Sequence, residues 1–375
     1  MQKLLTLCIV ALVLISAVAV APAAAEEHDA TYQECEFPVT VEDATGEEIT
    51  LEEPPDRVTT TSPSAAQIMW ELDAQDQVVG VTRFATYLDG ASERTDVSAQ
   101  FGVNIEKVAN TTPDLVLAPN TSAGNVEGLR SANLTVYHYA AATEIDDIRE
   151  QTRVTGQLTG NCEAAAETNA WMDANVDAIS EVVAEADEQP GVMYSLGGQE
   201  GQDPFIVGGN TFVTSMLEAA GANNVAADEG TGYPQLSAEV ILELDPEFLI
   251  VTEGGESIVE SEPYASTTAG QEGNTITLQV NYLSQPAPRS VVFTTHNATE
   301  QLHPEVYSPD TYVPRSDITV ISESEAEAQQ ETATPTPSEA QQETPTETAD
   351  SVPGFGAIAA LVAMLAAALV ATRRR

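Results

Sequence analysis

The stretch that decides the fold is EAAAETNAWMDANVDAISEVVAEADE, residues 163–188. It contains no Gly or Pro and is rich in Ala and Glu, which are strong helix formers. Its apolar residues, among them Trp171, Val176, Ile179 and Val183, are spaced to form one face of a helix. We therefore predict a single helix roughly 39 Å long, from a rise of about 1.5 Å per residue.

On both sides of this helix, short apolar runs alternate with helical segments. Residues 57–61 form a predicted strand, and Ser64 is expected to cap the helix that follows. Asn104 is expected to cap a short helix that contains Ile105 and Val108, and residues 114–118 form another strand. The alternation resumes after the long helix, with strands expected at 192–195 and 247–252. Because such alternation is typical of parallel sheets covered by helices, we expect an α/β fold. The expected architecture is two Rossmann-like lobes with mainly parallel sheets, joined by the long helix, with a ligand cleft between them.

The N-terminal residues have the features of an export signal. Lys3 precedes an apolar run over residues 4–20, and three alanines at 23–25 form a small-residue cleavage site. Cys8 lies inside the apolar run and is expected to be lost with it. In an exported chain the two remaining cysteines, Cys35 and Cys162, favour a disulfide over a metal site or a catalytic thiol, although sequence alone does not bring them together in space.

The C-terminal residues form a tripartite tail. Residues 322–351 are almost entirely Ser, Thr, Glu, Gln, Ala and Pro, which is typical of an extended stalk without a core. Pro353, Gly354 and Phe355 follow, then an apolar run over 356–372 and three arginines. This tail resembles the PGF-CTERM signal of haloarchaeal surface proteins. The resemblance implies that an archaeosortase removes the apolar helix and that a lipid anchor replaces it; a retained transmembrane helix is the alternative. In both cases the protein works at the extracellular face of the cell membrane.

The expected parts, in chain order, are a signal peptide (1–25), an N-terminal α/β lobe (26–161), a linking helix (162–189), a C-terminal α/β lobe (190–321), an acidic stalk (322–351) and a sorting signal (352–375).

The charge balance limits the partners. The chain has 59 acidic and 13 basic residues and a net charge of −46, which becomes −50 when Lys3 and the three terminal arginines are removed. Such charge is typical of an extreme halophile, because molar salt screens the repulsion, and it excludes nucleic acid as a partner. Export also permits N-glycosylation at the four Asn-x-Ser/Thr sequons, of which we expect one or two to be used: Asn110, Asn120, Asn133 and Asn297.

Several segments between residues 37 and 306 resemble the substrate-binding proteins of metal-chelate ABC importers, which include cobalamin and siderophore binders. VNIEK (103–107) followed by PDLV (113–116) is similar to a helix-then-strand block of that family. YPQLSAE (233–239) followed by LDPE (244–247) is similar to the same block in the second lobe. The resemblance implies a monomer whose partners are a membrane permease and its cytoplasmic ATPase. It also implies a lobe closure of only a few degrees.

Ligands of open α/β sheets bind beyond the carboxyl ends of the strands. Together with the resemblance, this predicts the following ligand-binding residues: Ser62, Ser64, Phe84, Tyr87, Asn120, Tyr233, Asn281, Tyr282 and Arg289. The aromatic residues suit a large, partly planar ligand, and Arg289 either pairs with an acidic ligand or stabilises the last helix. The family's cobalamin binders place tryptophan where this chain has Gln100 and Tyr233. That difference weakens the case for cobalamin and leaves siderophores or haem open.

Glu106 and Glu239 occupy matching places in the two repeated blocks. In the family the residues at these places form salt bridges with arginines of the permease, which implies a docking role here. The alternative is a first-turn glutamate that only stabilises its helix.

Nothing in the sequence indicates catalysis. No Gly-x-Ser-x-Gly, His-Glu-x-x-His or Cys/His cluster occurs, and the histidines at 28, 138, 296 and 303 are scattered. We therefore expect no cofactor and no metal site. The prediction is a surface-anchored solute-binding protein of an ABC importer that captures an iron chelate (siderophore or haem) or a corrinoid. The alternatives are a surface hydrolase and a structural or adhesive surface protein with the same tail.

Overall fold

The computed structural model describes residues 28–199 and 202–326. The predicted signal peptide, the motif at residues 353–355 and most of the predicted stalk lie outside the described residues. The first residue of that predicted stalk, Ser322, is the last residue of a strand.

The N-terminal lobe is built on a parallel sheet of five strands in the order β6-β5-β4-β7-β8. The central strands β4 and β7 are fully buried, as expected where helices cover both faces of a sheet; β7 is apolar throughout, whereas β4 carries two buried threonines, Thr59 and Thr60. The strands of this lobe are β4 (Val58–Thr60), β5 (Val78–Val81), β6 (Thr95–Asp96), β7 (Leu115–Ala118) and β8 (Val136–His138). Its helices are α1 (Pro63–Glu71), α2 (Ile105–Asn110), α3 (Ala123–Ser131) and α4 (Ile145–Thr159). An antiparallel hairpin, β2 (Val39–Glu42) and β3 (Glu48–Leu51), precedes the sheet.

The prediction that Ser64 caps the first helix was wrong by two residues. Ser62 is the N-cap of α1, and its side chain accepts a hydrogen bond from the backbone N–H of Ser64. Pro63 explains the shift: its fixed φ and lack of an N–H suit the first helical position, so the cap must precede it. The predicted cap of α2 is confirmed, because Asn104 Oδ1 accepts from the N–H of Lys107 at 2.9 Å.

The C-terminal lobe has a second sheet, in the order β10-β9-β12-β13, in which β11 also pairs with β9. All its pairs are parallel except β10 with β9. Its strands are β9 (Gly191–Gly197), β10 (Phe205–Ile206), β11 (Asn223–Asn224), β12 (Phe248–Thr252) and β13 (Thr275–Leu278). Its helices are α6 (Phe212–Ala219), α7 (Ala238–Leu244), α8 (Thr268–Glu272), α9 (Val280–Leu283) and α10 (Pro288–Leu302).

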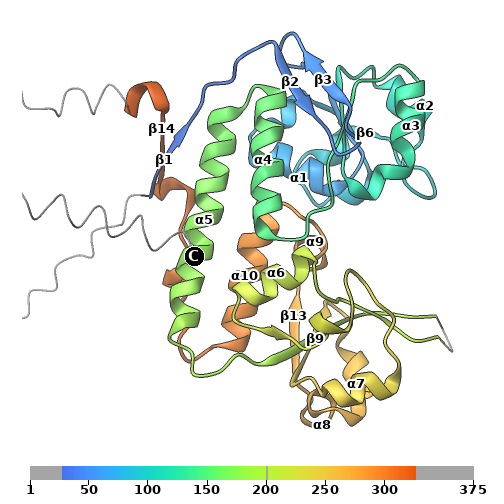
Figure 1. Ribbon diagram of the computed structural model, residues 1–375, viewed down its shortest axis with the longest axis vertical. Helices are drawn as coiled ribbons and strands as arrows, with labels where there is room; N and C mark the ends of the chain where they lie inside the picture. The colour runs from blue at the N-terminus through green and yellow to red at the C-terminus, as the bar shows by residue number, and fades with distance from the viewer. Residues whose placement is uncertain (1–27, 200–201, 327–375) are drawn as a thin grey trace, which may run out of the picture. The chain divides into compact units, whose positions relative to one another are not determined.

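One long helix, α5 (Cys162–Ala184), runs along both lobes (Figure 1). It ends four residues before the predicted position, Glu188. Residues 185–189, between the end of α5 and Pro190, have no buried side chain. No tertiary packing therefore supports further helical turns there. In the described residues no helix combines the length and the apolar character that a bilayer crossing requires.

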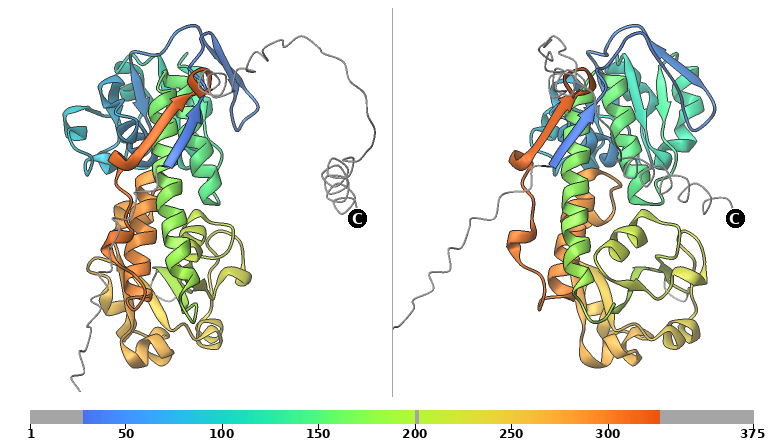
Figure 2. Two further views of the ribbon diagram at one scale, coloured as in Figure 1. Left: turned by 90° about the vertical axis from the view of Figure 1, so that its left-hand side faces the viewer. Right: turned by 60° about the vertical axis from the view of Figure 1, so that its left-hand side comes forward.

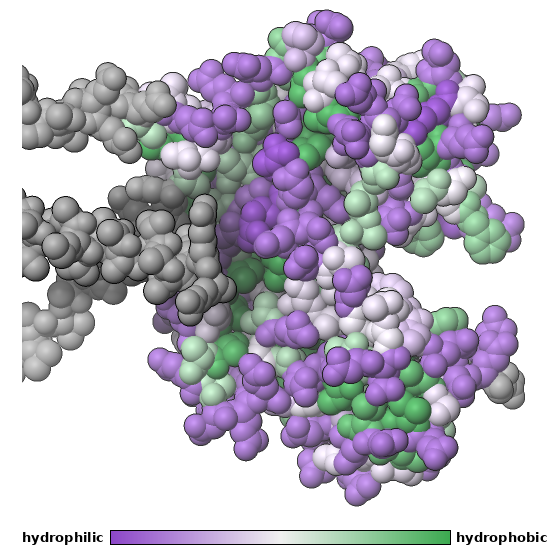
Figure 3. Space-filling view, viewed as in Figure 1, coloured by the Kyte–Doolittle hydropathy of each residue, from purple (hydrophilic) through white to green (hydrophobic). Residues whose placement is uncertain are grey.

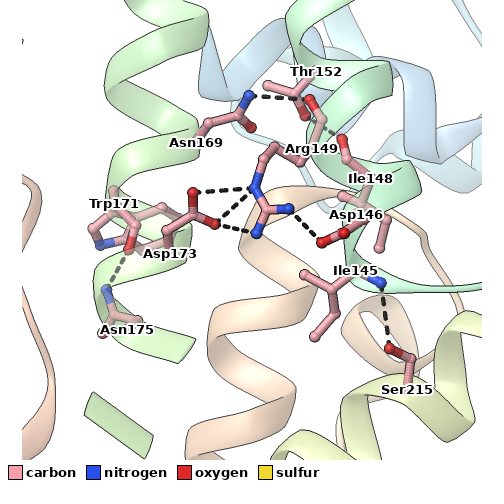
Figure 4. A network of polar contacts seen from close by, with 10 residues as sticks. All are labelled: Ile145, Asp146, Ile148, Arg149, Thr152, Asn169, Trp171, Asp173, Asn175 and Ser215. Carbon is pink, nitrogen blue, oxygen red and sulfur yellow. Dashed lines mark hydrogen bonds and ion pairs between the residues drawn. The ribbon is translucent and has the colours of Figure 1, made fainter. Parts of the chain in front are cut away.

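Polar contacts fix α5 to its neighbours. Arg149 of α4 donates to both carboxylate oxygens of Asp173 on α5, with Nε to Oδ1 at 3.0 Å, and also pairs with Asp146 (Figure 4). The Asp173 and Asp146 carboxylates raise the pKa of Arg149, although partial burial opposes them. At the start of the same helix, the N–H of Ile145 donates to Ser215 Oγ on α6 at 3.3 Å (Figure 4). The helix α4 therefore contacts elements of both lobes.

The two ends of the described chain pair with each other. The strand β1 (His28–Tyr32) lies parallel to β14 (Ile318–Ser322), and both pack along α5 (Figure 2). Nearby, Cys35 and Cys162 form a disulfide with a Cα–Cα distance of 5.6 Å. The start of the folded part is thus tied to the strand that precedes the predicted stalk.

Candidate ligand-binding site

The carboxyl ends of both sheets lead into loops that face the space between the lobes. The N-terminal strands continue into Arg83, Ser98 and Asn120, and the C-terminal strands into Gly198 and Val280. Figure 3 shows the surface hollowed between the upper and the lower lobe. An α/β sheet binds its ligand at this edge, so these loops form the candidate site.

Exposed apolar side chains gather at this edge. Eight large apolar side chains are exposed in the described residues, and four belong to the loops or strand ends named above. Two more lie beside the end of β9, because Phe205 pairs with Gly197 and also bridges to Gln235, two residues after Tyr233. These six, which we call the apolar rim, are Phe84, Phe101, Leu196, Phe205, Tyr233 and Val280. The other two, Leu242 on α7 and Tyr312, lie elsewhere. Because an exposed apolar group costs free energy in water, such a concentration marks a binding surface.

The most exposed member is Phe101, at 87%. It lies at the tip of a small hairpin, in which Ser98 bridges to Val103 and the N–H of Ala99 donates to the carbonyl of Gly102. Gly102 has a φ of 66°, a left-handed conformation that favours glycine, so the turn is specified locally. Phe101 follows Gln100, the position where the sequence comparison noted a lost tryptophan. The sequence prediction did not include Phe101, although an aromatic residue before a glycine in a loop was the available signal.

Arg83 connects two parts of the apolar rim. Its guanidinium carbon lies 4.8 Å from the ring centroid of Phe84, and its Nη1 donates to the carbonyl of Ala99 at 2.9 Å. Arg83 forms no ion pair with a carboxylate within the described part of the chain. This guanidinium group therefore lies beside the candidate site without a carboxylate partner within the described residues.

Several predicted ligand residues are used inside the protein. Ser62 and Ser64 are only 5% and 3% exposed, and their hydroxyls lie 2.9 Å apart at the start of α1. The hydroxyl of Tyr87 accepts from Gln67 Nε2 at 2.7 Å, and Gln67 in turn accepts from Ser290 of α10 at 3.0 Å. Burial raises the pKa of Tyr87 to about 12, against the opposing effect of the Gln67 hydrogen bond. These contacts tie the N-terminal lobe to the last helix.

Arg289 is likewise held by an internal partner. Its Nη2 lies 2.5 Å from Glu71 Oε1, and Arg315 pairs with the other oxygen of the same carboxylate. The Glu71 side chain is 4% exposed, and its burial raises its pKa despite the two guanidinium groups. This arrangement favours the stabilising alternative for Arg289. The sequence prediction overlooked Gln67 and Glu71, whose signal was a pair of long polar side chains in an otherwise apolar helix.

The remaining predicted ligand residues lie at or near the surface. Tyr233 is 46% exposed, and Asn120 and Asn281 are exposed at the carboxyl ends of β7 and β13. Tyr282 is half-buried, and its ring lies 5.2 Å from the ring of Phe293. The structure therefore brings Phe84, Tyr233 and the two asparagines to the sheet edges that carry the apolar rim.

Glu106 and Glu239 occupy equivalent positions in the two lobes. Each is exposed in the first turn of a short helix, α2 or α7, whose N-caps are Asn104 and Ser237. Both carboxylates are therefore open to solvent, one in each lobe.

The described residues contain no group of three or more His, Cys, Asp or Glu side chains arranged to hold a metal ion. His138, His296 and His303 are all buried, and His138 Nδ1 lies 2.7 Å from the carbonyl oxygen of Ala118. An open pocket of about 480 Å³ lies along α3 and includes Glu127 and Arg130, and no residue of the apolar rim lines it.

Comparison with known proteins identifies the family. A sequence model of the periplasmic binding protein family matches residues 58–282, and one of the PGF-CTERM motif matches residues 352–374. A cobalamin-binding protein of Halobacterium salinarum (strain ATCC 29341 / DSM 671 / R1) is 44% identical over 287 residues, 73% of this chain and 76% of that protein. An ABC transporter substrate-binding lipoprotein of Bacillus subtilis (strain 168) is 27% identical, covering 74% of this chain and 87% of that protein.

Solved structures give the same fold. The apo form of the periplasmic heme-binding protein RhuT from Roseiflexus sp. RS-1 has a TM-score of 0.59 and 24% identity, covering 66% of this chain and 99% of that one. The heme-binding protein HmuT has a TM-score of 0.63 and 20% identity, covering 76% and 94%. At these identities the likeness concerns the fold alone. Taken with the sequence matches, it shows that the chain belongs to the periplasmic binding protein family, as a haloarchaeal member that is exported and anchored at the cell surface by a PGF-CTERM tail.

Proposed function

We propose that this protein captures a corrinoid between its lobes and delivers it to the permease of an ABC importer. The observation that carries the proposal is the apolar rim, with Phe84 and Phe101 in one lobe and Leu196, Phe205, Tyr233 and Val280 in the other. Two facing apolar edges suit a ligand large enough to touch both lobes. The 44% identity to a cobalamin-binding protein supports a corrinoid as that ligand.

The tryptophans of related cobalamin binders have aromatic replacements here. Phe101 lies next to Gln100, and Tyr233 is itself aromatic, so flat apolar faces remain at both places. The sequence-based argument against cobalamin therefore loses its weight. Arg83 adds a positive charge beside Phe84, which suits an anionic group on the ligand, such as the phosphodiester of a corrinoid nucleotide.

Haem is the second candidate, because solved heme-binding proteins share the fold. Haem iron takes an axial ligand such as His or Tyr. His138, His296 and His303 are buried, whereas Tyr233 is an aromatic donor that is exposed at the rim. The donor set alone therefore does not separate the two ligands. The corrinoid is preferred because the cobalamin-binding relative is 44% identical to this chain, whereas the two heme-binding proteins are 24% and 20% identical.

In this proposal the protein catalyses nothing and acts as a monomer that carries its ligand to the permease and its cytoplasmic ATPase. Glu106 and Glu239 contact the permease, one from each lobe. Closure is small, because α5 and the contacts of Gln67 and Glu71 with α10 join the lobes. An archaeosortase exchanges the C-terminal segment for a lipid anchor.

The test is ligand binding by the purified protein in molar KCl. Cobalamin is expected to raise the melting temperature in a dose-dependent way, while haemin and ferric siderophores at equal concentration do not. Phe101→Ala is expected to weaken cobalamin binding about tenfold, because the burial of one aromatic ring is worth more than 1 kcal/mol. Leu242→Ala removes an apolar side chain that is 43% exposed and lies away from the rim, and this variant is expected to bind like the unaltered protein. A shift with haemin alone, or equal binding by both variants, would refute the proposal.

A further inference from the structure

The four sequons differ in what the fold does with them. N-glycosylation requires access to the asparagine amide and to the hydroxyl two residues later. Only at Asn133 are both side chains exposed without a buried residue between them: Asn133 and Thr135 are exposed, and Leu134 is half-buried. Asn133 has a φ of 61° and lies in the turn between α3 and β8, so it projects from a bend.

Each of the other sequons contains at least one buried residue. Ser122, the hydroxyl residue of the Asn120 sequon, is 3% exposed and bonded to Thr61 Oγ1 at 2.8 Å. Thr299, the hydroxyl residue of the Asn297 sequon, is fully buried in the last turn of α10. Within the Asn110 sequon, Thr111 is 5% exposed, and its hydroxyl lies 2.7 Å from Thr59 Oγ1 inside the sheet. A transferase would have to unfold each of these segments to bind it.

We propose that Asn133 is the N-glycosylation site of this protein and that the other three sequons are unmodified. The donor would be an oligosaccharide joined to a polyisoprenyl phosphate. Asn133 Nδ2 forms a bond to the anomeric carbon and loses one proton, while the bond from that carbon to the phosphate oxygen breaks and the lipid phosphate leaves with the electron pair.

The position of Asn133 is compatible with ligand uptake. It precedes β8, an edge strand of the N-terminal sheet, and so lies at the amino edge, opposite the carboxyl edge that carries the apolar rim. Asn120 follows the carboxyl end of β7. A glycan at Asn120 would cover the ligand edge, whereas one at Asn133 leaves that edge open.

The experiment is glycopeptide mass spectrometry on the full chain, produced and exported in a haloarchaeal host. The peptide that contains Asn133 is expected to carry an oligosaccharide. Thr135→Ala should abolish it, whereas Thr135→Ser keeps the sequon and should retain it. Ser122→Ala, the matched change in the Asn120 sequon, should leave the glycan mass unchanged. An unmodified Asn133 in the exported protein, or a glycan on Asn110, Asn120 or Asn297, would overturn the proposal.

Discussion

At the scale of single residues, Glu71 illustrates how this fold uses a buried charge. Its carboxylate is 4% exposed and meets Arg289 from α10 and Arg315 from the turn Arg315–Asp317. A buried charge is tolerated only when it is paired, and breaking such a pair is costly. The arginine predicted to bind ligand is therefore expected to stabilise the contact between the lobes.

A double-mutant cycle tests this role. Arg289→Gln and Glu71→Gln are each expected to lower the free energy of unfolding by about 2–4 kcal/mol, because each leaves a buried partner unpaired. The double variant should lose less free energy of unfolding than the two single variants together. Chemical denaturation in molar KCl measures these losses. Cobalamin affinity should change less than threefold in Arg289→Gln. A large loss of affinity at full stability would instead make Arg289 a ligand residue.

His296 is a second buried polar residue with assigned partners. Asn175 Nδ2 donates to the carbonyl oxygens of Trp171 and Val313, so Asn175 Oδ1 accepts from His296 Nε2 at 2.9 Å. His296 Nδ1 then accepts from the hydroxyl of Tyr307 at 3.1 Å. This network suits the neutral imidazole, and burial lowers the pKa of His296 to about 4.

The lowered pKa predicts a pH dependence. The neutral form is favoured in the folded state, so the stabilisation is complete above the ordinary pKa of 6.5 and is lost as the pH falls toward 4. The free energy of unfolding is expected to fall by about 3 kcal/mol as this stabilisation is lost. His296→Gln lacks the titrating group, so its free energy of unfolding should fall about 3 kcal/mol less than that of the unaltered protein between pH 7 and pH 4. The shared carboxylates cancel in this difference, and identical pH profiles would contradict the assignment.

At the scale of elements, α2 and α7 are short helices that begin at a capped first turn in each lobe. Glu106 or Glu239 contributes little to helix stability, because an exposed first-turn charge is worth about 0.3–1 kcal/mol and is screened by salt. The matching exposed positions of Glu106 and Glu239 are therefore better explained by contact with another protein than by helix stabilisation.

Charge reversal separates docking from ligand binding. Glu106→Lys combined with Glu239→Lys is expected to reduce cobalamin uptake by cells at least tenfold while leaving the affinity of the purified protein unchanged. Glu300→Lys alters another exposed carboxylate, on α10, and serves as the control with normal uptake. Uptake that survives the double reversal would leave both glutamates with a purely helical role.

At the scale of the whole described chain, distant segments are joined covalently and by pairing. The Cys35–Cys162 disulfide spans 127 residues and ties the segment after β1 to the start of α5. On the other side of that segment, β1 pairs with β14. Both ends of the folded part therefore depend on α5.

Removal of the disulfide should destabilise the whole protein. Closing a loop of this length restricts the unfolded chain, and its loss is expected to cost about 2–5 kcal/mol of the free energy of unfolding. Cys35→Ser, Cys162→Ser and the double variant should be destabilised equally, because each removes the same bond. Unequal losses, or unchanged unfolding under a reductant, would show that the bond contributes little in solution.

The sequence by itself determined the helices and strands, and it determined that the protein is exported and anchored at the cell surface. Apolar periodicity, as at residues 57–61 and 163–188, and helix capping, as at Asn104, depend on residues a few positions apart, so the sequence predicts them. The terminal segments likewise indicate export and anchoring. The end of α5 was predicted too late, because propensity continues past Ala184 where packing does not.

Only the tertiary structure decided which polar and aromatic side chains are exposed to a ligand and which are held by partners inside the protein. Tyr87, Ser62, Ser64 and Arg289 turned inward, whereas Phe101, Leu196, Phe205 and Val280 came to the surface of the sheet edges. Burial depends on neighbours brought from far along the chain: Arg315 meets Glu71 across 244 residues. No local pattern encodes such a meeting, because the free energy of a charge or an aromatic ring is set by what surrounds it in space.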